Sequence, residues 1–317
     1  MTLVLQELIV GLTVGAVYSL IALGYTMVYG IIELINFAHG DIFMIGSFVA
    51  LTMLAILGVA PGQHLTGLSL VGVLVLVGIV SLLVCAILGV VIERVAYRPL
   101  RNAPRLAPLI SAIGVSLILE DVGKLWKGVT FVVFPQFFPD ISVNLGSLNI
   151  SAVNILVLCV SLALMAALQI LVTRTRIGRA MRAVAQDREA AALMGVNVDR
   201  IIAVTFFIGA GLAGVAGFIY GLQAGSTAFY LGYQLGLIAF TAAVLGGIGN
   251  LVGAMLGGVL IGIVEALATL IPDSNVNVWG LPHGGSAWHE AVIFAILILI
   301  LVFRPSGLLG QRVPEKV

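Results

Sequence analysis

The sequence predicts an all-helical membrane protein, a polytopic bundle that crosses the bilayer about eight to ten times. Hydrophobic residues make up 61% of the 317 residues and charged residues only 9%, whereas about 25% of residues are charged in soluble domains. Three stretches contain no Asp, Glu, Lys or Arg: 42–92, 141–173 and 201–264. About 20 apolar residues in a helix cross the hydrocarbon core, so these stretches hold several crossings. Continuous apolar runs argue against a membrane β-barrel, whose strands alternate in segments of about ten residues.

Apolar runs between polar breaks predict nine helices in a single transmembrane domain that takes up residues 1–317. Their expected ranges are 6–30, 38–59, 68–92, 107–124, 150–172, 200–222, 232–248, 251–271 and 289–303. The 38 glycines suit such helices, because small residues let membrane helices pack backbone to backbone. Gly258, Gly262 and Glu265 share one helical face. We therefore expect the Glu265 carboxyl to face protein, as a hydrogen-bonded group or as part of a gate.

Two segments interrupt the helical pattern and are candidates for the edge of a conduction path. They are GIIELINFAHGD at 30–41 and LGGIGNLVG at 245–253, the second with Gly247 and Asn250. Non-helical backbone at membrane depth is tolerated only where protein or a water-filled cavity satisfies its hydrogen bonds. In transporters, paired breaks in the two halves mark the translocation site. A plain cytoplasmic turn between two helices is an equally good interpretation of 245–253.

The first interruption concentrates polar side chains, with Glu33, Asn36, His39 and Asp41 within nine residues. Glu33 and Asn36 would share a face of a continuous helix. An ionised group at the bilayer centre costs about 2.5–3.5 kcal/mol, so each needs a partner, a cavity or an interfacial position. Asn36 and His39 are candidates for a substrate path. The alternative is that His39 and Asp41 satisfy each other or lie at the membrane interface, with a helix end near 36–40. Tyr25 belongs to a stripe of tyrosines that either lines such a path or packs against other helices.

Positive charges gather in three segments. Of the 15 Lys and Arg residues, four lie at 94–105, six at 174–200 and three at 304–316. Positively charged loops stay in the cytoplasm, so nine crossings place the N-terminus outside and the C-terminus in the cytoplasm. Three loops expected outside, at 60–67, 223–231 and 272–288, contain no Lys or Arg. The remaining two lysines, Lys124 and Lys127, precede a further stretch that is also expected outside.

The segment 187–195 predicts a short helix within the cytoplasmic loop 174–200. Asp187 suits the N-cap, Glu189 favours the first turn, and Gly195 suits a left-handed end. A helix of about two turns is unstable alone in water. It must therefore dock on another surface, and the alternative is a solvated loop of charged residues.

The string EAAALMG at 189–195 resembles the E-A-A-x-x-x-G pattern of the coupling loop in permease subunits of ABC importers. The stretches GLTVGAVYSLIALGYTMVYGIIELINFAHGD and AAVLGGIGNLVGAMLGGVLIGIVE are similar to the LivH-type permeases for branched-chain amino acids. In that family the loop forms a short helix that inserts into a groove on the cytoplasmic ATPase. The resemblance implies a coupling role for Asp187, Glu189, Ala190, Ala191 and Gly195.

The resemblance also implies a function and a set of partners. The chain would be the permease subunit of an importer for branched-chain amino acids in the bacterial inner membrane. Its partners would be a second, LivM-like permease subunit, two cytoplasmic ABC ATPase subunits, a periplasmic substrate-binding protein and membrane lipid, without nucleic acid. The sequence contains no G-x-x-x-x-G-K-[ST] string, so ATP is expected on the partner subunits and no cofactor on this chain.

Other transport functions stay open at this point. Related permeases with the same motifs predict urea, short amides, and aromatic or dicarboxylic acids as alternative substrates. An ion-coupled secondary transporter is a different class of function. In that class, protons or sodium would bind at Glu33, His39, Asp41 or Glu265.

An intramembrane enzyme fits the sequence least well. Cys85 and Cys159 each lie within an apolar run and are expected to be small buried hydrophobic residues. The four histidines lack the spacing of metal ligands. We therefore expect neither catalytic residues nor a metal site.

Overall fold

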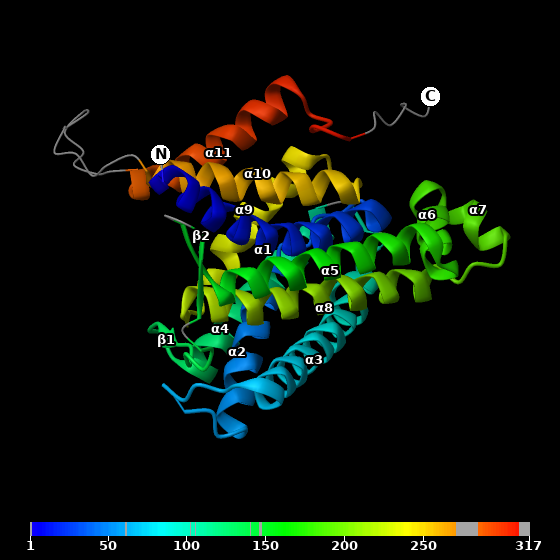
Figure 1. The fold of residues 1–317 in the computed structure, drawn as a ribbon. Coiled ribbons are helices and arrows are strands. Elements are labelled where there is room, and N and C mark those ends of the chain that lie inside the picture. The colour runs from blue at the N-terminus through cyan, green and yellow to red at the C-terminus, as the bar shows by residue number, and fades with distance from the viewer. Residues whose placement is uncertain are drawn as a thin grey trace.

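The chain forms a bundle of long helices in the computed structural model (Figure 1). The structure describes residues 2–60, 62–101, 103–104, 106–139, 141–145, 148–270 and 285–310. Seven helices are long and apolar enough to cross a membrane: α1 (Thr2–Ile32), α2 (His39–Ile56), α3 (Gly67–Ile92), α4 (Leu106–Lys127), α5 (Ala152–Arg174), α8 (Val198–Ala224) and α10 (Leu251–Thr269). Two shorter apolar helices are α9 (Leu231–Gly246) and α11 (Gly285–Phe303). The nine predicted helices are all present, with ends that match to within four residues.

The short elements mark the two ends of the bundle. A π-helix, η1 (Glu93–Tyr97), leads into a turn of 3₁₀ helix, η2 (Arg98–Leu100). The helices α6 (Arg176–Gln186) and α7 (Arg188–Leu193) protrude from one end, which we call the α6–α7 end (Figure 1). The opposite end, called the hairpin end, carries two antiparallel pairs. These are β1 (Val132–Val133) with β4 (Ser226–Thr227), and β2 (Ser142–Leu145) with β3 (Leu148–Ser151).

Helices α1 to α4 and helices α8 to α11 form two halves with the same order of contacts. Helix α1 packs along α10, and in the same way α8 packs along α3. Helix α2 contacts α4, and α9 contacts α11. The halves run in opposite directions, because Ile31 and Ile32 at the end of α1 line the same hollow as Ile202 at the start of α8. The fold is therefore an inverted repeat, an arrangement that recurs in transporters.

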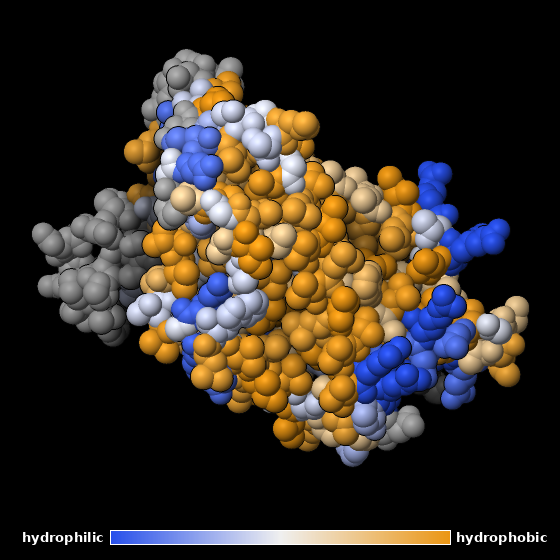
Figure 2. All heavy atoms as spheres, turned by 90° about the horizontal axis from the view of Figure 1, so that it is seen from below, coloured by the Kyte–Doolittle hydropathy of each residue, from blue (hydrophilic) through white to orange (hydrophobic). Residues whose placement is uncertain are grey.

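The centre of the bundle is formed by α2 and α8, in which most residues are buried. The outer helices are different, since most residues of α3, α4 and α5 are half-buried or exposed. Figure 2 shows a broad hydrophobic face of this kind, with hydrophilic residues gathered toward its margins. Lipid is the environment in which such a face is stable, so the described residues form a multi-pass membrane protein.

Close backbone contact joins the two halves. A Cβ added at Gly258 would lie 2.3 Å from Ser19 Oγ, and one at Gly262 would lie 2.4 Å from the Cα of Gly15. Ser19 Oγ also donates a hydrogen bond of 2.7 Å to the carbonyl of Met255. The predicted packing through small residues is confirmed for this face of α10.

One cysteine differs from the sequence-based expectation, and one expected loop cannot be compared with it. Cys85 is buried as expected, but the expectation for Cys159 was wrong, because its side chain is exposed. The reason is that α5 lies on the outside of the bundle, where an apolar residue faces lipid rather than protein. Residues 272–284 of the expected outer loop lie outside the described residues.

Candidate coupling and translocation sites

The loop 174–200 contains one more helix than the sequence predicted. Thr175 accepts a hydrogen bond of 3.1 Å from the backbone of Gly178 and so caps α6. The buried residues Met181 and Val184 hold one face of α6 against the bundle, and its arginines lie on the exposed side. We expected only a basic loop here. The spacing of Met181 and Val184 between arginines was the available signal of an amphipathic helix.

Helix α7 has the predicted cap and the predicted end. Asp187 Oδ1 accepts hydrogen bonds from the backbone N–H groups of Glu189 (2.9 Å) and Ala190 (3.0 Å). Gly195 follows the helix with a φ of 83°, the left-handed conformation that glycine adopts without strain. The local predictions for Asp187 and Gly195 are confirmed.

The exposed tip of α7 is more apolar than the sequence motif suggested. Leu193 is 89% exposed and Met194 is 84% exposed. Glu189 and Ala190 are also exposed, whereas Ala191 is buried and holds α7 against its neighbours. Two large apolar side chains this exposed, next to a cluster of arginines at the end of the bundle, are typical of a surface that a protein partner covers. The sequence interpretation did not include Leu193 and Met194.

One polar contact joins α7 to the end of α1. Arg188 Nη2 donates a 2.8 Å hydrogen bond to the carbonyl of Ile31. Beside this contact lies a half-open hollow of about 460 Å³, lined by residues of α6 and α7 and by Glu33, Leu34, Tyr97 and other residues at the ends of the bundle helices.

The first interruption is a true break in the helix. Helix α1 ends at Ile32, Glu33 follows with a φ of 56°, and α2 begins only at His39. Asn36 is buried in this segment, and its Oδ1 accepts a 2.8 Å hydrogen bond from the hydroxyl of Tyr97. Glu33 is exposed. The idea that Glu33 and Asn36 share a helical face was wrong, because residues 33–38 are not helical.

Tyr25, His39 and Asp41 come together where the segment meets α2. The rings of Tyr25 and His39 lie edge to face with their centroids 4.8 Å apart. Asp41 is fully buried and accepts a hydrogen bond from Ser116 of α4, so His39 and Asp41 do not satisfy each other. A Cβ added at Gly40 would lie 2.2 Å from the carbonyl oxygen of Gly232. The N-termini of α2 and α9 therefore meet inside the protein, and both helix dipoles favour the negative charge of Asp41.

The second interruption is a tight turn covered by the C-terminal segment. Gly247 has a φ of 105°, and Asn250 Oδ1 caps α10 by accepting a 3.0 Å bond from Gly253. Asn250 also donates to the carbonyl of Leu309 at 2.8 Å. The nearest cavity, beside Tyr25 and Ile248, measures about 10 Å³, and a site for one water needs about 10–15 Å³. This geometry favours the interpretation of 245–253 as a turn.

Glu265 lies apart from both interruptions. The half-buried carboxyl lies beside the hydroxyl of Tyr18 in α1, so the expected orientation of Glu265 toward protein is present. The six residues expected along a path thus fall into three places. Tyr25, Asn36 and His39 belong to the first interruption, Gly247 and Asn250 to the second, and Glu265 to the contact of α1 with α10.

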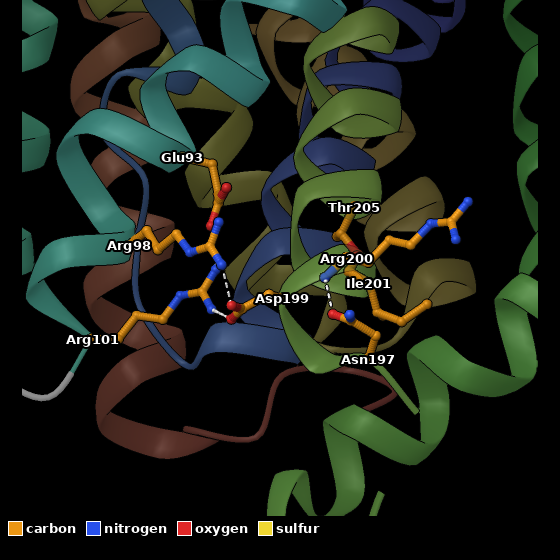
Figure 3. A network of polar contacts seen from close by, with 8 residues as sticks. All are labelled: Glu93, Arg98, Arg101, Asn197, Asp199, Arg200, Ile201 and Thr205. Carbon is orange, nitrogen blue, oxygen red and sulfur yellow. Dashed lines mark hydrogen bonds and ion pairs between the residues drawn. The ribbon is translucent and has the colours of Figure 1, made fainter. Parts of the chain in front are cut away.

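An ion-pair network that the sequence did not reveal joins the two halves at the α6–α7 end. Arg101 pairs with the buried carboxylate of Glu93 and with Asp199, and Arg98 pairs with Asp199 as well (Figure 3). The network connects η1 and η2 to the first turn of α8. Among the described residues, no group of three or more His, Cys, Asp or Glu side chains is placed to hold a metal ion.

Comparison with known proteins decides the family. A family model described as the permease component of branched-chain amino acid transport systems matches residues 8–301. The chain belongs to this permease family. The permease is 44% identical over 322 residues to the high-affinity branched-chain amino acid transport system permease protein BraD of Pseudomonas aeruginosa, which covers 99% of this chain and 98% of that protein.

Two further relatives are also high-affinity branched-chain amino acid transport system permease proteins. The permease protein LivH of Escherichia coli K12 is 44% identical over 320 residues, 99% of this chain and 97% of the relative. LivH of Salmonella typhimurium is 42% identical over 318 residues, with the same coverage of 99% and 97%. No solved structure matches this permease. The resemblance seen in the sequence motifs is confirmed over nearly the whole chain.

Proposed function

We propose that this chain is the transmembrane permease subunit of an ABC importer that carries branched-chain amino acids across the bacterial inner membrane. The observation that supports this most strongly is the 44% identity, over 99% of the chain, to two proteins described as high-affinity permeases for these amino acids. The inverted repeat of broken helices is consistent with alternating access. A catalytic role forms no part of the proposal.

The energy for transport comes from separate ATPase subunits that bind α6 and α7. Leu193 and Met194 form an apolar tip at the end of the bundle, and Glu189, Ala190 and Gly195 lie beside it. Asp187 and Ala191 hold α7 in place from inside. A tip of this kind fits a groove on a protein partner, because burial of two large apolar side chains contributes about 1.5–3 kcal/mol each. ATP is bound by these partners.

Translocation requires movement at the first interruption, because the side chains of Tyr25, Asn36 and His39 are buried there. Tyr25, Asn36 and His39 are the proposed path residues there, since they offer a hydroxyl, an amide and an imidazole to a zwitterion. Gly247 and Asn250 form the turn about which α9 and α10 move. Glu265 and Tyr18 act nearer the hairpin end as a gate that closes behind the substrate.

The distribution of positive charge supports the proposed orientation. Arg98, Arg101 and the arginines of α6 all lie at the α6–α7 end. The hairpin end carries fewer cations, among them Lys124, which lies over the ring of Phe229. The positive-inside rule then places the α6–α7 end in the cytoplasm and the N-terminus outside. The full assembly contains a second, homologous permease, two ATPases and a periplasmic binding protein that docks at the hairpin end.

Reconstituted transport tests this proposal. The chain, its partner permease, both ATPases and the binding protein are placed in proteoliposomes, and uptake of labelled leucine, isoleucine and valine is compared with uptake of urea, acetamide and a dicarboxylic acid. We expect uptake of the three branched-chain amino acids that requires ATP and persists when ionophores dissipate ion gradients. Uptake by the isolated chain under an ion gradient would show a secondary transporter instead, and selective uptake of urea or amides would overturn the substrate assignment.

A further inference from the structure

Besides the apolar contacts of α6 and of Ala191, one polar side chain of α7 reaches the end of α1. Arg188 is the first residue of α7, and its half-buried guanidinium donates a 2.8 Å hydrogen bond to the carbonyl of Ile31. This hydrogen bond joins α7 to α1. The other neighbours of α7 are α6, which precedes it, and α8.

The acceptor is well suited to a guanidinium. The last backbone bond of α1 runs from the N–H of Glu33 to the carbonyl of Tyr29, at 2.8 Å. The carbonyl of Ile31 therefore lies beyond the helical hydrogen bonds, and a helix end leaves such groups without a backbone partner. The C-terminus of a helix also carries partial negative charge, which favours a cation. Arg188 thus caps the end of α1 from a different structural unit.

The capped end leads directly into the first interruption. Glu33 follows with a φ of 56°, a conformation that costs a non-glycine residue about 1 kcal/mol or more. Three residues later Asn36 is fixed by Tyr97, and His39 starts α2 against Tyr25. A displacement of the Ile31 carbonyl would be passed along six residues to the place where α2 and α9 meet. A change of Glu33 to a negative φ would relieve this strain, so the backbone can change conformation there at low cost.

The hollow beside Arg188 gives this movement room. It has a volume of about 460 Å³ and lies between α7 and the ends of α1, α4 and α8. The hollow leaves unfilled space between Arg188 of α7 and the ends of these helices, so movement of α7 on this side meets less packed protein than movement toward α8, which Ala191 contacts.

We infer that Arg188 is the positioning residue through which movement of α7 reaches the interrupted segment 33–38. The inference rests on the proposed function, since it assumes that an ATPase moves α7. It assigns a role to a residue outside the E-A-A-x-x-x-G motif, and it predicts that transport depends on the contact of Arg188 with a backbone carbonyl rather than on positive charge in the loop.

The test uses three variants in the complete transporter in proteoliposomes. Arg188→Gln removes the cation, and Arg188→Lys keeps a cation with a shorter, less extended donor. Arg179→Gln is the matched control, because Arg179 is an exposed arginine of α6. Each variant is measured for leucine transported per ATP hydrolysed. We expect a loss of about tenfold in Arg188→Gln, equivalent to about 1.4 kcal/mol, a partial recovery in Arg188→Lys, and no change in Arg179→Gln.

A second readout separates transmission from a purely structural role. Leu34, which lines the hollow, is replaced by Cys in a chain that also carries Cys159→Ser. The rate at which the new cysteine reacts with a water-soluble maleimide is then measured without nucleotide and with ATP and vanadate. With Arg188 present we expect the rate to differ between the two states. In Arg188→Gln the difference should disappear, although the ATPases still copurify and still hydrolyse ATP.

The outcomes are distinct. Arg188→Gln that keeps both its transport ratio and the nucleotide-dependent change at position 34 overturns the inference and leaves the proposed function intact. If Arg188→Gln does not assemble with the ATPases, the Arg188→Lys variant decides between the outcomes. The inference is overturned if this variant has the same transport ratio and the same nucleotide-dependent change at position 34 as the unsubstituted chain. Reduced values of both support the inference. Uptake by the unsubstituted transporter that does not need ATP overturns the proposed function and this inference with it.

Discussion

The hydroxyl of Tyr97 donates a 2.8 Å hydrogen bond to Oδ1 of Asn36, and both side chains are buried. The bond joins η1 to the interrupted segment, so it holds non-helical backbone in place at the end of α1. Membrane proteins tolerate such backbone only where protein groups satisfy it.

We predict that Tyr97→Phe destabilises the protein, because it leaves the buried amide oxygen of Asn36 without its partner. The expected loss is about 1–3 kcal/mol, measured as a lower midpoint of thermal unfolding in detergent. Tyr233→Phe is the control, since the Tyr233 side chain is 57% exposed. Equal midpoints for the two variants would show that the bond to Asn36 carries no stability.

Gly258→Ala should separate α1 from α10. The added Cβ would lie 2.3 Å from Ser19 Oγ and 2.5 Å from the backbone nitrogen of Ser19, closer than any van der Waals contact allows. We expect a loss of about 1–3 kcal/mol from overpacking. The control Gly72→Ala meets nothing within 4 Å on α3 and should leave stability unchanged or raise it. A stable Gly258→Ala variant would contradict the backbone contact.

The ion-pair network of Glu93, Arg101 and Asp199 predicts non-additive effects. Arg101→Leu leaves the buried carboxylate of Glu93 without its partner, and such a loss costs about 3–5 kcal/mol. In the double variant with Glu93→Leu, no buried charge remains unpaired, so stability should recover in large part. The measurement is a double-mutant cycle in thermal unfolding. Additive effects of the two substitutions would contradict the pairing shown in Figure 3.

Glu189→Ala combined with Gly195→Ala should uncouple ATP hydrolysis from transport. Gly195 has a φ of 83°, so alanine strains the end of α7, and Glu189 no longer favours its first turn. We expect leucine uptake to fall at least about tenfold, or by about 1.4 kcal/mol in coupling, with normal insertion in the membrane.

The matched control for that variant lies at the hairpin end. Glu7→Ala combined with Gly62→Ala changes one acid and one glycine with a φ of 81° far from α7. This control should leave leucine transported per ATP hydrolysed unchanged, because it alters no residue of α7. A parallel loss of uptake in both double variants would mean that general destabilisation, rather than α7, explains the effect.

The helices could be predicted from the sequence because each is marked by its own apolar run and polar break. The N-cap at Asp187 and the left-handed end at Gly195 also depend only on neighbouring residues in the sequence, so they could be predicted as well. Tertiary relationships were not accessible in this way. The pairing of Tyr97 with Asn36, the network around Arg101 and the contact of Arg188 with Ile31 each join segments far apart in the sequence.

The exposure of side chains could not be predicted from the sequence either, because an apolar run has the same composition whether it faces protein or lipid. Cys159 was therefore misplaced, and Glu33 was assigned to a helical face in a segment that has no helix. The apolar tip at Leu193 and Met194 was not predicted, because the sequence motif does not show which side chains of α7 are exposed. Helix α6 was missed because its arginines were interpreted as a loop.

The most direct test of the account is site-specific photo-crosslinking from position 193 in inner-membrane vesicles that contain the whole transporter. A photoreactive amino acid replaces Leu193, with Leu68 as the control, since both side chains are 89% exposed. We predict a crosslink from position 193 to an ATPase subunit and none from position 68. Crosslinks from position 193 to lipid alone, or labelling of that position by an impermeant reagent added on the periplasmic side, would contradict the claim that α7 receives the force of ATP hydrolysis.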